Sequence, residues 1–303
     1  MASVSVVIPS AGGLDLIRAL ASVNEQTHPV DETIVILNNM APSAAQGLAR
    51  KPELSGCIVE YERTPGACAA RDRGVELASS DYVAFLDADD LWRPEKIRRT
   101  MQLTAGDADV VSSRVRYFND NSGTPVATAP VSTFSPGADL GSWLFVNRRL
   151  SVRRNVLHTS SLVVRAELAK SLRWFMGAPH EDWSFLLQAE RAVGTAGFRQ
   201  LPDVLVDVSM GTGRSLSAGI DCKSSLDWLI QHGEFLGDRA YADFLAGQVL
   251  RYALSGSSSR RTFEVFSEMS GNWRLVSARA LALGASGLLG RQVFERLAAW
   301  KKI

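Results

Sequence analysis

Short, β-branched apolar segments alternate with stretches of helical periodicity in the first third of the chain, and this alternation most constrains the fold. Residues 4–8, 33–37, 57–61 and 82–86 have the length and composition of buried strands. Apolar residues at helical spacing separate them, for example over residues 14–23. The pattern predicts βαβ units and an α/β fold, with a mainly parallel central sheet flanked by helices.

The later sequence is less regular. Residues 110–117 have a strand pattern, whereas residues 119–137 are rich in Asn, Ser, Thr, Pro and Gly and are expected to form a loop. Residues 198–208 predict two short strands interrupted at Pro202. From residue 221 the spacing is mostly helical. We therefore expect an α/β domain over residues 1–220 and a helical C-terminal region over residues 221–303.

Composition excludes several classes of protein. The 303 residues are 46% hydrophobic and 21% charged with a formal net charge of +1, so no global field would recruit nucleic acid. Cys57, Cys68 and Cys222 form no CxxC pair, which argues against a disulfide framework or a zinc site. No run approaches the roughly 20 apolar residues of a membrane span, and no signal peptide is evident. We expect a cytoplasmic protein.

Polar residues follow two of the predicted strands. Asn38-Asn39 and Asp87-Ala88-Asp89-Asp90 lie where parallel strands end, which is where such sheets bind ligands. If the strand continues, Asp87 and Asp89 point to the same face and can hold Mg²⁺ or Mn²⁺. A solvated acidic turn is the plainer alternative. A calcium loop does not fit, because Leu91 and Trp92 stand where its pattern needs Asp or Asn and then Gly.

These motifs together resemble a known family. Residues 85–92 (FLDADDLW), followed by Pro94-Glu95-Lys96, resemble the signature of the family 2 glycosyltransferases, which have the GT-A fold. The resemblance covers residues 3–208. It includes the opening strand ending at Pro9, the segment from Gly66 through Ala70-Arg71-Asp72 to Gly74, and His180-Glu181-Asp182-Trp183.

The resemblance implies an inverting enzyme that transfers a sugar from a nucleotide-diphosphate sugar to a hydroxyl acceptor. It assigns Asp87 to the nucleoside, Asp89 to the divalent metal (Mn²⁺ or Mg²⁺), and Arg71 to the neighbourhood of the donor. Pro9, Asn38 and Asn39 fall at the nucleobase. The family usually has acidic residues where Asn38 and Asn39 stand. A UDP-sugar remains the favoured donor.

The same resemblance assigns the acceptor side. Asp182 matches the general base, and His180, Glu181 and Trp183 fall beside the acceptor. A helix N-terminus is the structural alternative for Glu181-Asp182. Arg214, in the Gly-rich residues 211–215, would close over the donor. Residues 1–115 then form the nucleotide-sugar-binding half and residues 116–220 the acceptor-binding half. The aromatic residues Trp174, Phe175 and Trp183 would line a sugar site or pack in the core.

The C-terminal region is basic and partly apolar. Residues 260–303 carry eight Lys or Arg and three Glu, and apolar residues recur at helical spacing after residue 288. This pattern suits a peripheral contact at the inner face of a membrane, consistent with a lipid-linked rather than a free saccharide acceptor. The alternative is a helix that packs on the catalytic domain or forms a homodimer.

Two other functions remain compatible with the motifs. A nucleotidyltransferase with a similar sheet usually has a basic Gly-rich loop after its first strand, and residues 10–15 contain no basic residue. A catalytically inactive binding or scaffold subunit is favoured only by Asn38-Asn39. Intact Asp87, Asp89 and Asp182 oppose it.

Overall fold

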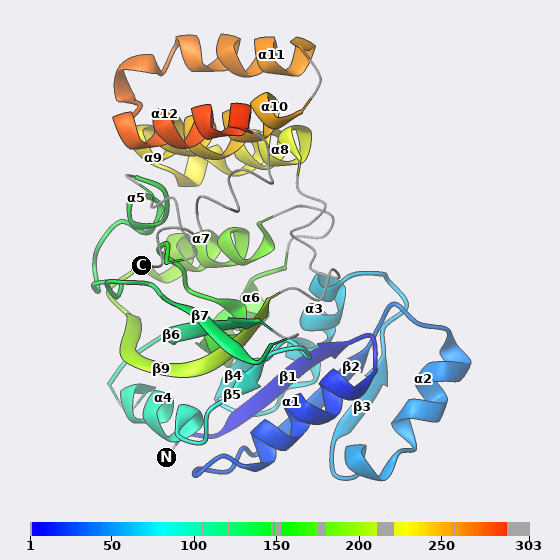
Figure 1. Ribbon diagram of the computed structural model, residues 1–303. Coiled ribbons are helices and arrows are strands. Elements are labelled where there is room, and N and C mark those ends of the chain that lie inside the picture. Colours follow the sequence, from blue (N-terminus) through cyan, green and yellow to red (C-terminus); the bar gives the residue numbers. More distant parts are fainter. Residues whose placement is uncertain are drawn as a thin grey trace. The chain divides into compact units, whose positions relative to one another are not determined.

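The computed structural model describes residues 2–104, 106–119, 122–146, 148, 153–174, 180–210, 221–256 and 259–289 (Figure 1). The chain forms two compact units. The first contains residues 1–138, 157–177 and 181–212, and the second contains residues 139–156, 178–180 and 213–303. The second unit thus combines residues 213–303 with two segments from the middle of the chain.

The first four strands of the first unit confirm the expected βαβ pattern. They lie parallel in the order β3-β2-β1-β4, and helices connect β1 to β2, β2 to β3 and β3 to β4. The strands are β1 (Val4–Ser10), β2 (Glu32–Leu37), β3 (Ile58–Tyr61) and β4 (Tyr82–Phe85), and the connecting helices are α1 (Leu14–Asn24), α2 (Pro42–Ala49), the 3₁₀ turn η1 (Pro52–Leu54) and α3 (Ala67–Leu77). Every residue of β1 is buried, as its position inside the sheet requires.

The remaining strands extend this sheet with mixed directions. Beyond β4 the order is β8-β6-β9-β5, and β7 pairs with β6. The parallel pair β6 and β9 lies beside antiparallel pairs on both sides. The elements are β5 (Leu91–Trp92), α4 (Lys96–Thr104), β6 (Val110–Asn119), β7 (Thr124–Ala129), η2 (Thr159–Ser161), β8 (Val163–Arg165), α6 (Ala166–Ser171), α7 (Glu181–Val193) and β9 (Phe198–Met210).

Two expectations about this part of the sheet are wrong. Phe198–Met210 is one strand rather than two. Its pairing with β6 passes from Leu201 directly to Val204, so Pro202 lies in an irregularity where it needs no partner and the strand continues beyond it. The expected loop at residues 119–137 contains β7, in which Thr124 and residues 127–129 pair with β6 despite the surrounding turn residues.

A glycine allows α3 to lie close against the sheet. A Cβ atom on Gly74 would come within 2.3 Å of Val7 Cγ1 on β1, so only glycine permits this approach. Arg71 precedes Gly74 by about one helical turn and is buried. The close packing of α3 on β1 therefore fixes where the Arg71 side chain lies.

The second unit is helical, in agreement with the expected C-terminal region. Within it, Phe244 meets Phe145 and His180 edge to face, with ring centroids 5.1 and 5.6 Å away. No helix among those described is long and apolar enough to cross a membrane. The elements are α5 (Leu140–Phe145), α8 (Cys222–His232), η4 (Gly233–Phe235), α9 (Asp238–Phe244), the π-helical turn η5 (Leu245–Val249), α10 (Leu250–Ser255), α11 (Ser259–Ser270), η6 (Trp273–Leu275), α12 (Ala278–Ala285) and η7 (Ser286–Leu289).

Lys96 is an unusual core residue at the start of α4. Its side chain is fully buried, its Nζ lies 4.5 Å from the centre of the Trp92 ring, and among the described residues no group hydrogen-bonds that nitrogen. Burial lowers the pKa of Lys96 from 10.5 to about 7.

This shift predicts a pH-dependent cost to stability. Between pH 7 and 10.5 the unfolded chain keeps the proton that folded Lys96 has lost, so stability rises with pH in that window. We expect Lys96→Met to be most stabilising relative to wild type at pH 7, with the difference shrinking by up to about 1.4 kcal/mol per pH unit towards pH 10. Urea unfolding across this range measures it. Lys51→Met, at an exposed position, is the control, and parallel pH curves for Lys96→Met and wild type would contradict the assignment.

Candidate active site

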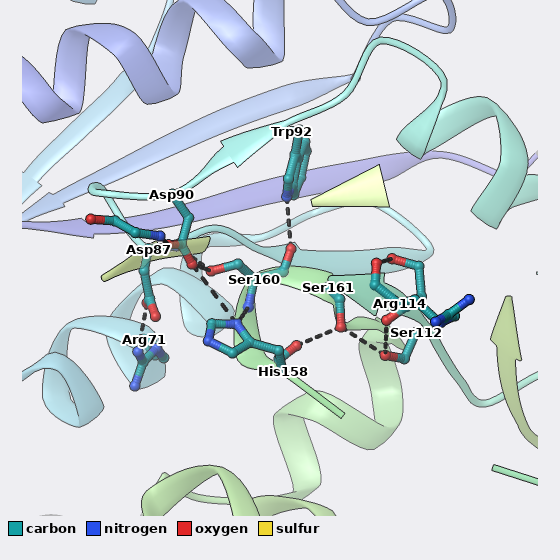
Figure 2. A network of polar contacts seen from close by, with 11 residues as sticks. Arg71, Asp87, Asp90, Trp92, Ser112, Arg114, His158, Ser160 and Ser161 are labelled. Atoms are coloured by element: carbon teal, nitrogen blue, oxygen red, sulfur yellow. Dashed lines mark hydrogen bonds and ion pairs between the residues drawn. The ribbon is translucent and has the colours of Figure 1, made fainter. Parts of the chain in front are cut away.

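The Arg71 guanidinium joins three separate parts of the first unit. Its Nη2 lies 2.6 Å from Asp87 Oδ1, just beyond β4, and its Nη1 lies 2.6 Å from Glu181 Oε1 at the start of α7. The Arg71 side chain is only 3% exposed, whereas those of Asp87 and Glu181 are 26% and 20% exposed. Figure 2 shows Arg71 below Asp87, with a dashed line joining the two side chains. One cation therefore holds two carboxylates predicted to serve opposite sides of the reaction.

Aromatic packing fixes the plane of this guanidinium. Arg71 lies over the Trp174 ring at 4.6 Å, and Trp174 stacks on Phe185 of α7 with ring centroids 4.4 Å apart. Trp174 also meets Phe85 edge to face. Trp174 is thus a buried support for Arg71 rather than a sugar platform, and Trp183 is buried as well. Phe175 lies outside the described residues.

One cation faces two carboxylates in this cluster. Burial alone would lower the pKa of Arg71, but the carboxylates of Asp87 and Glu181 outweigh it and raise that pKa above its ordinary value. Burial, and then the neighbouring Glu181, raise the pKa of the Cys68 thiol. The thiol therefore stays protonated and donates to Glu181 Oε2 at 2.8 Å. Glu181 is held by two donors, so its orientation is fixed.

The acidic motif forms a turn and does not continue the strand, which corrects the sequence-based geometry. β4 ends at Phe85, and the Asp90 amide donates to the Asp87 carbonyl at 3.0 Å, closing a turn over residues 87–90. Asp87 is partly buried and Asp89 is exposed. Strand alternation therefore does not orient Asp87 and Asp89; the turn does.

The donor chemistry of this turn fits a hard divalent cation that is only partly coordinated by protein. Among the described residues no group of three or more His, Cys, Asp or Glu is arranged to enclose a metal ion. Mg²⁺ commonly binds through one or two carboxylates and takes its other oxygens from phosphate and water. Asp89, with Asp87 beside it, offers oxygens of that kind.

Asn38 serves the structure of the site. It is buried; its Nδ2 donates to the carbonyls of Glu62 and Thr64 at 2.9 and 2.7 Å, and its Oδ1 accepts from the Gly66 amide at 2.8 Å. Gly66 caps the N-terminus of α3. Asn38 therefore ties the end of β2 to the start of the helix that carries Arg71.

The other residues expected at the nucleobase lie near the same rim. Pro9 is buried in β1 opposite Ile36 of β2. Asn39 is exposed at φ 55°, and its Oδ1 accepts from the Gly66 amide at 3.2 Å. Of the asparagine pair, Asn39 is the side chain that reaches solvent. Arg214 lies outside the described residues.

The acidic pair begins α7. Glu181 and Asp182 occupy its first turn, where the helix dipole favours carboxylates, and Asp182 Oδ1 accepts from the Trp183 amide at 2.9 Å. The helix-start and site interpretations of this pair are therefore compatible. His180 belongs to the second unit, where it is buried at φ 68° and its Nε2 lies 3.0 Å from Ser225 Oγ.

Comparisons with known proteins test the family resemblance found in the sequence. The profile described as Glycosyl transferase family 2 matches residues 5–155, about half of the chain. The chain belongs to this family. The amylovoran biosynthesis glycosyltransferase AmsB of Erwinia amylovora is 28% identical over 274 residues, covering 84% of this chain and 86% of that protein. The chain is thus a glycosyltransferase, and the nucleotidyltransferase alternative is wrong.

Similar solved structures identify the fold of this glycosyltransferase. S. aureus TarS, residues 1–349 in complex with UDP-GlcNAc, superimposes with a TM-score of 0.63 at 15% identity, covering 98% of this chain and 89% of that one. The Pyrobaculum calidifontis mannosyltransferase PcManGT, in complex with GDP-Man and Mn²⁺, gives a TM-score of 0.51 at 18% identity, covering 99% and 79%. The fold is GT-A, as the sequence motifs predicted.

Several contacts within the site had no signal in the sequence. Ser160 Oγ accepts a hydrogen bond from the Asp87 amide at 3.1 Å, although the two residues are 73 positions apart in the sequence. Cys68 and Trp174 contact Glu181 and Arg71 from other elements. Asp90, the last residue of the acidic motif, is buried, and burial and then the neighbouring Asp87 and Asp89 raise its pKa well above the ordinary value. Such contacts depend on tertiary packing, which periodicity does not report.

The central position of Arg71 predicts a large effect of its removal. Arg71→Met leaves Asp87 and Glu181 facing each other without a cation, so we expect transfer to fall at least about 100-fold and unfolding stability to fall by about 3 kcal/mol. Arg73→Met on the same helix is the matched control. Its pairs with Glu60 and Glu76 are partly exposed, so it should cost under about 1 kcal/mol. Equal losses for the two variants, measured by urea unfolding and initial rates, would refute the assignment.

Proposed function

We propose that this glycosyltransferase moves a sugar, with inversion, from a nucleotide-diphosphate sugar to a hydroxyl acceptor during synthesis of a cell-surface polysaccharide or glycoconjugate. The observation that carries the proposal is the Arg71 bridge, which places the acidic turn of the donor side and the acidic start of α7 on one guanidinium. A UDP-sugar is the favoured donor, and the acceptor is a saccharide or a lipid-linked saccharide.

The relatives support the substrate class. AmsB is named for amylovoran biosynthesis, TarS was solved with UDP-GlcNAc, and PcManGT was solved with GDP-Man and Mn²⁺. The two nucleotide sugars differ in their base. We assign the base contact to Asn39, because the Asn38 side chain is buried and bonded to backbone groups. The asparagine pair was the single feature that favoured an inactive scaffold. The hydrogen bonds of Asn38 to backbone groups give one member of that pair a structural role.

On the donor side, carboxylates of the acidic turn would bind the ribose and the metal ion. Asp87 would accept hydrogen bonds from the ribose, with its orientation fixed by Arg71 and by the bond between its own amide and Ser160. Asp89 would ligate the divalent cation, Mn²⁺ or Mg²⁺, which when bound supplies charge neutralisation for the departing diphosphate. Arg71 acts on the donor through Asp87, because its two Nη atoms are engaged with carboxylates.

The acceptor side needs one base. In a single displacement, the acceptor oxygen bonds to the anomeric carbon as the bond from that carbon to the diphosphate breaks, and Asp182 takes the hydroxyl proton. Glu181 is less suited to accept this proton, because Arg71 and Cys68 donate hydrogen bonds to its two carboxylate oxygens. Glu181 therefore orients the start of α7, and Asp182, its neighbour in the first turn, remains the proposed base.

The proposal also includes three further site residues and a role for the C-terminal region. We retain His180 and Trp183 as neighbours of the acceptor and Arg214 as a contact to the diphosphate. A peripheral membrane contact at the inner face of the membrane, or a homodimer, would use the C-terminal helices, whose last residues, 290–303, lie outside the described ones.

Removing the proposed metal ligand, Asp89, should remove Mn²⁺ binding without unfolding the protein. We expect Asp89→Ala to abolish the increase in melting temperature that Mn²⁺ adds to UDP-sugar, because a ligand stabilises a protein only in proportion to its binding. Asp203→Asn, at a partly exposed acid paired with Arg99, is the control. An unchanged Mn²⁺-dependent shift in Asp89→Ala would contradict the metal assignment.

Replacing the proposed base should spare donor binding. Asp182→Asn keeps the size and helical position of the side chain but cannot take a proton, so transfer should fall by about 10²-fold or more while the donor-induced melting shift persists. Initial rates with a radiolabelled donor, alongside thermal shifts, test this. Transfer at the wild-type rate would exclude Asp182 as the base.

A further inference from the structure

The hydroxyl of Ser160 lies between the two ends of the acidic turn. Ser160, in η2, accepts a hydrogen bond from the Asp87 amide at 3.1 Å and donates one to Asp90 Oδ2 at 2.5 Å (Figure 2). A hydroxyl has one proton to donate, and here it goes to Asp90. A single side-chain oxygen therefore spans the turn from its first residue to its last.

Asp90 is held from a second direction. It is buried, and its Oδ1 accepts from the Ser209 amide near the end of β9 at 3.0 Å. A buried carboxyl that accepts from a hydroxyl and an amide on two different elements has little freedom to move. The acidic turn is thus fastened both to η2 and to β9.

Ser160 is itself fixed in place. Its carbonyl accepts from Trp92 Nε1 at 2.7 Å, and its amide donates to His158 Nδ1 at 3.3 Å. Trp92 follows the turn directly, in β5. Both sides of the turn therefore depend on the position of one serine, which is fully buried.

We propose that Ser160 and Asp90 are positioning residues that set the orientation of the Asp87 and Asp89 carboxylates for the metal-bound donor. The inference rests on the proposed function, since it assumes that these carboxylates receive the donor and the cation. Ser160 and Asp90 act through the backbone of residues 87–90 and touch neither donor nor metal, because both are buried behind the turn. Their loss should weaken donor and metal binding while leaving the acceptor side unchanged.

The neighbouring serine provides a matched control. Ser161 is equally buried in the same 3₁₀ turn, and its Oγ donates to the His158 carbonyl at 2.6 Å and lies 2.7 Å from Ser112 Oγ. Figure 2 shows these two bonds of Ser161, and within the described part of the chain Ser161 has no hydrogen bond to the acidic turn. Ser160→Ala and Ser161→Ala thus remove the same atom from the same element, but only Ser160→Ala frees the turn.

The test compares the apparent Kd of Mn²⁺ with UDP-sugar, from thermal shift or calorimetry, with the KM of the acceptor. We expect Ser160→Ala to weaken Mn²⁺ and donor binding about tenfold with the acceptor KM unchanged, and Ser161→Ala to change both less than about twofold. Equal effects of the two variants, or an acceptor KM that rises with Ser160→Ala alone, would overturn the proposal. If Ser160→Ala does not fold, Asp90→Asn is measured in its place, and wild-type Mn²⁺ affinity in that variant would also overturn it.

A double variant tests whether the two residues act through one bond. Asp90→Asn combined with Ser160→Ala should lose little more Mn²⁺ affinity than either change alone, whereas independent effects would multiply. Multiplied losses would overturn the shared role. Asp89→Ala, measured in parallel, separates the two levels: if it leaves the Mn²⁺ dependence intact the proposed function fails, and if it removes that dependence while Ser160→Ala does not, only this inference fails.

Discussion

The buried guanidinium of Arg71 is the constraint on which the site depends. Two carboxylates from distant parts of the chain, Asp87 and Glu181, share it at 2.6 Å each, and both offset the cost of removing this cation almost wholly from water. Trp174 supports its flat face. Glycine at position 74 lets α3 approach β1 closely enough to place Arg71 there. The site is therefore built from the packing of one helix.

The acidic turn shows how a short motif acquires a defined geometry. Its sequence supplies three carboxyls within four residues, whose mutual repulsion would favour a spread arrangement in water. Ser160 and Ser209 bind Asp90 in the interior, so this carboxyl becomes an anchor while Asp87 and Asp89 are left towards solvent. Asp90 thus fastens the turn that carries the other two carboxylates.

Sequence patterns predicted the part of the fold that local physics determines. Short β-branched runs and apolar helical spacing located β1, β2, β3 and β4, and the ends of β2 and β4 identified the rim that carries the site. The patterns missed β7, divided β9 at Pro202, and extended β4 through the acidic turn. The undivided β9, the structural role of Asn38 and the contacts of Ser160 depend on pairings between residues far apart in sequence, which no periodicity encodes.

The most direct test of the central claim is a crystal structure of this glycosyltransferase with UDP-sugar and Mn²⁺, in which anomalous scattering locates the cation. The account predicts one Mn²⁺ within about 2.2 Å of an Asp89 carboxylate oxygen and of the donor diphosphate, with Arg71 still paired to both Asp87 and Glu181. A cation bound away from residues 87–89, or Arg71 released from Asp87 to contact the phosphates directly, would contradict it.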